Sequence, residues 1–472
     1  MDPEFSLLKG SARKTEAWYF LVTFLVFAGV MNRSPNKRPE YWLFHFSALC
    51  AVGVCCTLVW HSRQLFPVNF PTFMILCSAG FLLSLFGAWA AARSAGQVGL
   101  WSVLWWCAVL RLVCVAGDPI YEDDYFRYLW DGRQTIETGS PYGDPPADYF
   151  LSETDEVWSE VLDNINNPEI GTIYGPVNQY VFALAYWLAP ADVKALQWVM
   201  AATDWLAILL LALLMVRMGV PHFGPLVLYG FSPLVLKEFS LTAHPDVLAI
   251  FGMVVGLLLW HRGQLRTAAL ALAFAVSAKI FAFLLVPLIL RWHWVAWAIF
   301  FATTALLHIP LGYGAGGGGG LAAMAGEWLF NAPLYFMLLN YVGMAPLKWT
   351  LLTVFGAGCA AYFFLAPYHR EQPTKMPRGD YLYLAMLFAV PVFNPWYYPM
   401  LLVFAVIYPS AWAWVGSLTV LFAYATGLQL ESQGLEPYGQ PAWALWVEFL
   451  PLIIAALVSP GRRWVAGLRR RG

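Results

Sequence analysis

The segment from residue 118 to residue 133 gathers carboxylates, cations and aromatic rings in a chain that is otherwise mostly apolar. Asp123 and Asp124 are adjacent, and Arg127 follows them. A carboxylate beside a membrane is costly to desolvate, so two neighbouring ones suggest a chemical task. A carboxylate placed there can take the proton of an attacking hydroxyl. The alternative is structural: both aspartates would stabilise the start of a helix and pair with Arg127.

The same segment predicts a helix that carries these groups. Asp118, followed by proline, is typical of a helix start. In that helix Asp124, Arg127, Tyr128 and Asp131 share one face, and apolar side chains occupy the other. We therefore expect an amphipathic helix on the membrane surface, with its polar face toward a cleft or water.

Polar residues within the apolar segments form a second candidate set. Lys279 lies deep in an apolar stretch, where a lysine usually faces a cavity or a partner, and it suits an anionic phosphate near the membrane. His244 and Asp246 stand at the start of a predicted span, where they either bind a substrate or only form a helix N-terminus. Lys237 is expected to extend its charged end to the membrane interface.

A third set is the aromatic run from Phe393 to Tyr398. Asn394 either caps the next helix or lines a cavity. Trp396 and Tyr397 either stack on a sugar or a lipid head group, or belong to an interfacial aromatic belt.

Composition indicates which elements must position these residues. The chain has 472 residues, of which 60% are hydrophobic and only 12% charged. Ordinary soluble domains have about 25% charged residues. Apolar runs of about 20 residues recur along the chain, which predicts an all-α polytopic integral membrane protein with about 12 to 15 transmembrane helices. The net charge of −1 gives no indication of nucleic-acid binding.

Charge distribution predicts the topology. The loop at 116–170 has 14 of the 28 acidic residues and two basic ones, whereas other loops and the C-terminal tail are basic. Basic loops are cytoplasmic by the positive-inside rule, so the acidic loop is expected on the extracytoplasmic face.

The apolar segments predict the individual elements. A short interfacial helix is expected at 175–189. Two stretches, 266–291 and 381–408, are predicted hairpins of short helices, because each has polar residues at its centre and broken helices at membrane depth border protein or a wet cavity. The predicted spans are 16–31, 41–60, 70–92, 98–115, 194–216, 223–239, 245–261, 294–311, 345–366, 411–428 and 441–458.

These motifs together resemble the GT-C superfamily of membrane glycosyltransferases. The chain looks most like prokaryotic polyprenyl-phosphate-mannose-dependent α-mannosyltransferases and their relatives in GPI-anchor synthesis. The resemblance covers residues 98 to 410, and its most specific part is the first extracytoplasmic loop. The motifs are Glu122-Asp-Asp-Tyr-Phe-Arg-Tyr-Leu-Trp-Asp-Gly-Arg133, Ser140-Pro-Tyr142, Thr172-Ile-Tyr-Gly-Pro176, His244-Pro-Asp246, Ser277-Ala-Lys-Ile-Phe281 and Asn394-Pro-Trp-Tyr397.

The resemblance implies a GT-C fold and an inverting transferase with no cofactor and no bound metal. The catalytic base would be Asp124, or else Asp123. Donor-phosphate contacts would come from Lys279, His244 and Arg127. The candidate substrate-binding residues are Tyr128, Asp131, Tyr174, Asp246, Asn394, Trp396 and Tyr397.

The resulting hypothesis is an enzyme of the cell membrane, with its active site on the extracytoplasmic face. It would move a sugar, mannose first of all, from a polyprenyl-phosphate donor to a lipid-linked or cell-envelope glycan. The expected organisation is extra N-terminal helices at 1–97, a catalytic module at 98–410, and C-terminal helices with a basic cytoplasmic tail at 411–472. A transporter or flippase of a lipid-linked sugar is the alternative, since transporters also have broken helices and a midplane cation. A non-catalytic scaffold would leave the acidic loop unexplained.

Overall fold

The computed structural model describes residues 37–64, 68–312, 328–365, 376–430 and 434–458. Regular structure in these ranges is helical, and one isolated strand-like bridge joins Phe330 to Val392. The span predicted at 16–31 and the basic tail from residue 459 lie outside the described residues.

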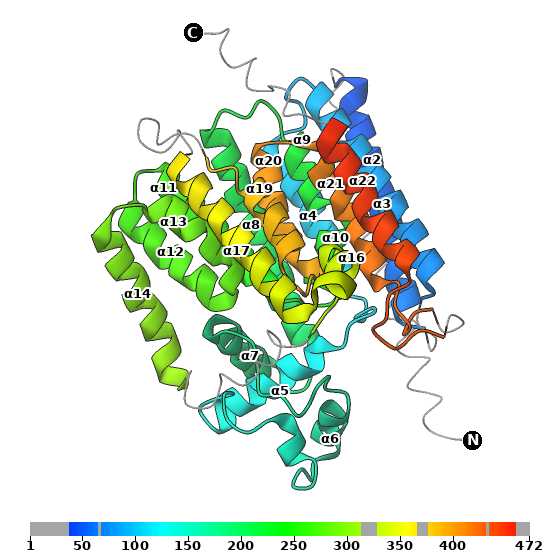
Figure 1. The fold of residues 1–472 in the computed structure, drawn as a ribbon. Coiled ribbons are helices and arrows are strands. Elements are labelled where there is room, and N and C mark those ends of the chain that lie inside the picture. Colours follow the sequence, from blue (N-terminus) through cyan, green and yellow to red (C-terminus); the bar gives the residue numbers. More distant parts are fainter. Residues whose placement is uncertain (1–36, 65–67, 313–327, 366–375, 431–433, 459–472) are drawn as a thin grey trace, which may run out of the picture.

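Long apolar helices form the body of the molecule (Figure 1). Five in the described ranges are long and apolar enough to cross a membrane, and one bent pair is a sixth candidate. The predicted all-α polytopic membrane protein is thereby confirmed, while the full number of spans stays a prediction. The five are α2 (Pro39–Ser62), α3 (Phe70–Arg93), α8 (Val193–Arg217), α14 with its continuation η4 (Trp294–His308, Ile309–Leu311) and α17 (Met344–Leu365).

The span expected at 223–239 is the first half of the bent pair, and it is interrupted rather than continuous. The two halves, Gly224–Leu241 and Asp246–His261, are bent by 117° at residues 242–245. Within the first half, Gly230 and Pro233 interrupt the helix, and proline removes a backbone donor and clashes with the preceding turn. A π-helical turn then leads to the second half. The pieces are α9 (Gly224–Gly230), α10 (Pro233–Val235), η2 (Leu236–Leu241) and α11 (Asp246–His261).

Shorter apolar helices complete the bundle. Both predicted hairpins are present as interrupted helices. The last part of the span predicted at 411–428 is 3-10 helix and ends at Tyr424. Helix α16 was not predicted. The bounds are α4 (Leu100–Val115), α12 (Leu265–Ala278), η3 (Ile280–Leu285), α13 (Val286–Leu290), α16 (Pro333–Val342), α19 (Gly379–Ala389), η5 (Pro395–Tyr397), α20 (Pro399–Ile407), α21 (Ala411–Thr419), η6 (Val420–Tyr424) and α22 (Ala442–Val458).

A layer of short helices covers one end of this bundle (Figure 1). The helix expected from Asp118 begins only at Asp124, because Tyr121 has a left-handed backbone (φ 62°) that interrupts it. Asp118 instead forms an ion pair with Lys194 at 3.0 Å. The layer consists of α5 (Asp124–Glu137), η1 (Pro146–Tyr149), α6 (Glu156–Asp163) and α7 (Pro176–Leu188), of which α7 is the short helix predicted at 175–189.

Helix α5 is covered more completely than its sequence pattern suggests. The ring of Tyr128 in α5 stacks on the ring of Phe182 in α7, with the ring centroids 4.7 Å apart. A Cβ atom on Gly132 would lie 2.5 Å from the carbonyl oxygen of Phe182, so the two helices touch at this glycine. Tyr128 and Asp131, expected on a polar face toward a cleft, are consequently buried between α5 and its neighbours.

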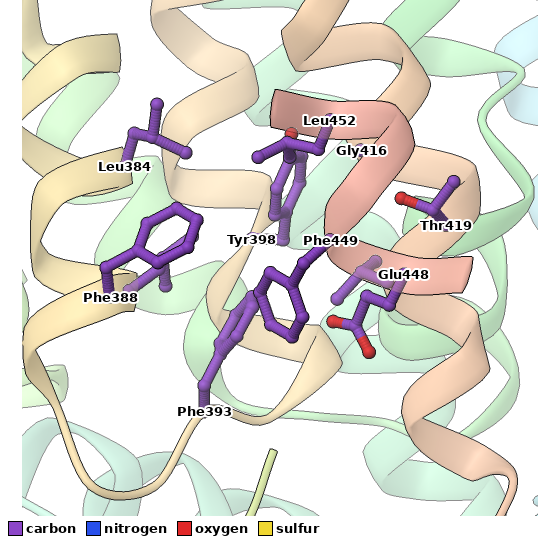
Figure 2. Close-up of a pocket in the computed structure, with 11 residues that line it drawn as sticks. Leu384, Phe388, Phe393, Tyr398, Gly416, Thr419, Glu448, Phe449 and Leu452 are labelled. Carbon is purple, nitrogen blue, oxygen red and sulfur yellow. The ribbon is translucent and has the colours of Figure 1, made fainter. Parts of the chain in front are cut away.

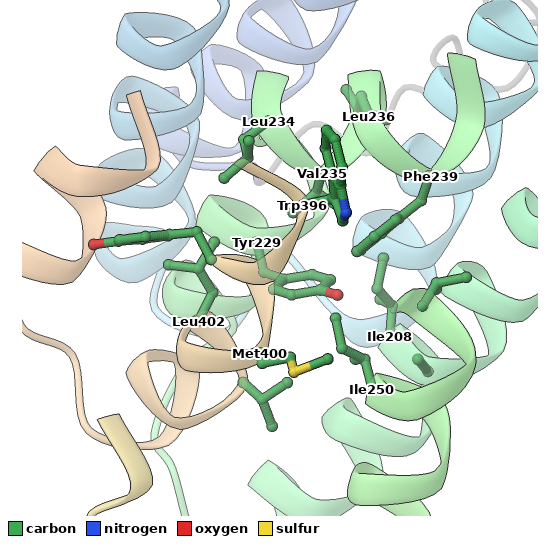
Figure 3. Packing of buried hydrophobic residues seen from close by; sticks show 14 of the residues in the cluster. Ile208, Tyr229, Leu234, Val235, Leu236, Phe239, Ile250, Trp396, Met400 and Leu402 are labelled. Atoms are coloured by element: carbon green, nitrogen blue, oxygen red, sulfur yellow. The ribbon is translucent and has the colours of Figure 1, made fainter. Parts of the chain in front are cut away.

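Buried groups tie the long helices together beneath this layer. Arg111 of α4 forms an ion pair with Asp204 of α8 at 2.5 Å, and Tyr229 of α9 donates to the same carboxylate. Apolar packing continues to η5, where Trp396 lies among buried side chains such as Phe239 (Figure 3).

Candidate functional site

A cavity of about 640 Å³ opens where the short-helix layer meets the bundle. Its wall includes the residues just before and within α5, the end of α12, and the segments around η5 and η6. The predicted residues that line it are Asp123, Asp124, Arg127, Tyr174, Lys279, Asn394, Trp396 and Tyr397.

Three consecutive carboxylates stand at the start of α5. Glu122, Asp123 and Asp124 each place one oxygen within 4.8 Å of the others, near enough to share a cation. Burial raises the pKa of Glu122 well above its usual range. Burial, with the charge of Asp124 beside it, raises the pKa of Asp123 to about 6. Carboxylates with raised pKa values are suited to proton transfer near neutral pH.

The two aspartates have different partners. Asp124 accepts a hydrogen bond from the hydroxyl of Tyr174 at 3.2 Å. Burial raises the pKa of Asp124, although this hydrogen bond and the charge of Lys279 act in the opposite direction. Asp123 accepts a hydrogen bond from the side-chain amide of Asn166. Each carboxylate therefore faces its own part of the cavity.

Lys279 supplies a cation to the same cavity. It directly follows α12, in an extended conformation that ends the helix. Asn178 of α7 donates to the last carbonyl of α12, at Ala278, at 2.9 Å, which satisfies a group that a helix end leaves unpaired. The ammonium of Lys279 lies 3.1 Å from the carboxylate of Asp246 and 4.3 Å from the centre of the Tyr397 ring.

His244 and Asp246 lie one layer behind the cavity wall. The ring of His244 stacks on Trp396, with centroids 3.9 Å apart, and its Nδ1 is 3.2 Å from the hydroxyl of Tyr128. Both residues are buried. In this arrangement His244 supports Trp396 from behind, and Asp246 holds Lys279.

Asp131 is also set back from the cavity. Arg127 donates to its carboxylate at 3.0 Å, and Gln179 donates to the other oxygen at 3.0 Å. Thr172 adds a further hydrogen bond to that oxygen. The guanidinium of Arg127, which lines the cavity, is held by Asp131 in turn.

Only part of the aromatic run from Phe393 to Tyr398 faces the cavity. Asn394, Trp396 and Tyr397 line the cavity. Asn394 stands at the N-cap of η5, but its side chain makes no capping hydrogen bond. Tyr398 points elsewhere, and its hydroxyl donates to the carbonyl of Ala413 at 3.0 Å.

A buried charged cluster was missed by the sequence analysis. Lys237, expected at the interface, is fully buried and lies 3.2 Å from the carboxylate of Glu238. Glu238 also accepts a hydrogen bond from Tyr424 at 2.9 Å, and Tyr424 lines the cavity. Adjacent unlike charges within an apolar run were the available signal, because a buried lysine needs an oppositely charged partner and Glu238 is the next residue.

A second, much smaller cavity lies between α19, α20, α21 and α22 (Figure 2). Its volume is about 10 Å³, and the carboxylate of Glu448 lies in its wall beside Phe393 and Phe449. That volume holds a single water molecule at most. The large cavity is therefore the candidate active site.

Comparison with known proteins identifies a family. A sequence profile of the family described as alpha-(1->6)-mannopyranosyltransferase, N-terminal domain, matches residues 48–296. The match covers just over half of the chain and includes the acidic loop, α5, α7 and Lys279. No curated protein and no solved structure matches the chain.

Proposed function

Because this chain belongs to the alpha-(1->6)-mannopyranosyltransferase family, we propose that it transfers mannose from a polyprenyl-phosphate donor to a glycan acceptor, with inversion. The acceptor is a lipid-linked or cell-envelope glycan, reached from the extracytoplasmic side of the cell membrane. One observation carries the proposal: a single cavity contains the paired aspartates and the cation Lys279.

The reaction assigns a task to each group. An acceptor hydroxyl attacks the anomeric carbon of the donor, and Asp124, or alternatively Asp123, takes the hydroxyl proton. The bond between that carbon and the phosphate oxygen breaks, and both of its electrons stay with the polyprenyl phosphate. Lys279 and Arg127 are the cations that stabilise the departing phosphate.

One wall of the cavity suits the lipid part of the donor. It consists of Trp328, Leu329, Phe330 and Val392, which we name the apolar wall. Apolar side chains accept a hydrocarbon chain without loss of hydrogen bonds. We propose that the donor enters the cavity from the bilayer on this side.

The catalytic module expected at 98–410 must be extended toward the C-terminus to include the whole cavity. Lining residues from beyond it, including Tyr424 and Tyr438, complete the cavity. We propose that the last helices contribute to the site as well as to the membrane anchor.

The test is transfer by the purified protein in detergent, with a polyprenyl-phosphate mannose donor and an alkyl mannoside acceptor. Asp124→Asn and Asp123→Asn are compared with Asp163→Asn, which changes an exposed carboxylate at the end of α6, outside the cavity. Loss of the general base should lower kcat by roughly 10²- to 10⁴-fold, while donor binding persists. Wild-type rates in both cavity variants would exclude this mechanism.

The same assay distinguishes a transferase from the alternative function, a transporter or flippase of a lipid-linked sugar. Detergent provides no second compartment, so product formation in solution requires an enzyme. A parallel reaction with EDTA tests whether the acidic triad of residues 122–124 needs a metal ion. We expect the rate to be unchanged, because Lys279 and Arg127 already supply positive charge at the phosphate.

A further inference from the structure

A second part of the cavity wall differs from the apolar wall, because it consists of neutral polar side chains. Its members share hydrogen-bonding groups without net charge, and three of them follow η6 near the C-terminal end of the chain. We name this the polar wall: Asn166, Asn167, Thr426, Gln429 and Tyr438.

The polar wall is built from two distant segments of the chain. Gly427 donates to the carbonyl of Gly439 at 3.1 Å, and Leu428 donates to that of Pro437 at 3.0 Å. These hydrogen bonds hold Tyr438 near the end of η6. Its hydroxyl then donates to the side-chain oxygen of Asn166 at 3.0 Å.

Asn166 connects this wall to the catalytic carboxylates. While its oxygen accepts from Tyr438, its amide nitrogen donates to Asp123. A group bound against Asn166 is thus adjacent to the triad of Glu122, Asp123 and Asp124, whose oxygens lie within 4.8 Å of one another.

The chemistry of the polar wall fits a sugar and not a phosphate. Amide and hydroxyl groups both donate and accept hydrogen bonds, as sugar hydroxyls do. A phosphate instead favours cations, which stand elsewhere in the cavity at Lys279 and Arg127. Tyr438 is 57% exposed, so its ring is open to a ligand.

We propose that the polar wall is the acceptor subsite, which binds the terminal sugar of a neutral mannoside and presents one of its hydroxyls to the carboxylates. This inference rests on the proposed transferase function. It assigns acceptor recognition to Tyr438 and Gln429, both beyond residues 48–296 that carry the family match.

The test measures acceptor and donor kinetics separately, with an octyl α-1,6-mannobioside as acceptor and polyprenyl-phosphate mannose as donor. The variants are Tyr438→Phe, Tyr438→Ala and Gln429→Ala. Tyr341→Phe serves as the matched control, because Tyr341 is an exposed tyrosine of α16 outside the cavity. Loss of one hydrogen bond should raise the acceptor KM by roughly 3- to 10-fold.

Hydrolysis of the donor in the absence of acceptor provides the second readout. We expect the donor KM to stay at its wild-type value in all three variants. The hydrolysis rate should also stay at its wild-type value in Gln429→Ala, because the hydrogen bond of Gln429 is with Thr426. Unchanged acceptor KM in Tyr438→Phe and Gln429→Ala, or an equal rise of both KM values, would overturn the acceptor subsite. Absence of transfer by the wild-type protein would instead refute the proposed function, so the two failures are distinguishable. Tyr438→Phe and Gln429→Ala decide the question even if Tyr438→Ala does not fold.

Discussion

Asp123 and Asp124 are neighbours in sequence but have separate hydrogen-bond partners. Asn166 donates to Asp123, and Tyr174 donates to Asp124. Each donor stabilises the charged form of its own carboxylate and thereby lowers its pKa, whereas burial raises both pKa values. The two partners therefore offer a way to learn which aspartate is the base.

The pH dependence of transfer should follow the acting carboxylate. A base works only when deprotonated, so kcat/KM falls as the pH decreases through its pKa, near 6 if Asp123 acts. Tyr174→Phe removes a hydrogen bond that lowers the pKa of Asp124. If Asp124 is the base, the acidic limb should move upward by roughly half to one pH unit. The measurement is kcat/KM between about pH 5 and pH 8.

The matched experiment is Asn166→Ala, which removes the corresponding donor from Asp123. A shift of the acidic limb in this variant alone would assign the base to Asp123. An acidic limb that stays in place in both variants would show that neither aspartate accepts the proton.

At the residue scale, sequence alone predicted groups that need an unusual environment. The charges of Asp123, Asp124 and Lys279 are costly to desolvate near a membrane. The structure places all three residues at one cavity. Nothing in the sequence indicated that Asn166 and Tyr438 belong to the site. They are common surface residues 272 positions apart, and only the folded chain brings them together.

At the element scale, breaks in helices position the site. Lys279 follows the end of α12, and Trp396 lies in η5 between α19 and α20. Polar residues at the centres of two apolar stretches predicted both breaks. The interruption within the span expected at 223–239 was not predicted, because Lys237 was taken as an interfacial residue and its pairing with Glu238 depends on the fold.

The close contact between α5 and α7 predicts the effect of adding a side chain at Gly132. Gly132→Ala should push the helices apart, since the added Cβ would lie 2.5 Å from the carbonyl oxygen of Phe182. Overpacking of this kind costs about 1–3 kcal/mol. We expect a lower thermal unfolding temperature in detergent and reduced transfer, because α5 carries Asp124 and Arg127.

The control for this variant is Gly143→Ala in the same loop, where a Cβ meets no atom within 4 Å. It should unfold and react as the wild type does. Equal behaviour of the two variants would mean that the contact between α5 and α7 does not position the carboxylates.

At the scale of the whole molecule, the cavity and the basic turns occupy different ends of the bundle. Helix α11 starts at Asp246, beside Lys279, and has 16 residues, a length of about 24 Å. It leads to a turn at 262–264, from which α12 returns to the cavity. That distance approaches the roughly 30 Å thickness of a bilayer core. The predicted extracytoplasmic position of the acidic loop requires this turn to lie in the cytoplasm.

Cysteine labelling in intact cells tests that topology. Ser152→Cys places a thiol at an exposed position of the acidic loop, and Thr267→Cys places one at the opposite end of the bundle. A membrane-impermeant maleimide should label Ser152→Cys in intact cells and label Thr267→Cys only after the membrane is opened. The unsubstituted protein gives the background, since its seven cysteines all lie within α2, α3, α4 and α17. Labelling in the reverse order would place the cavity at the cytoplasmic face, where an extracytoplasmic acceptor could not reach the polar wall.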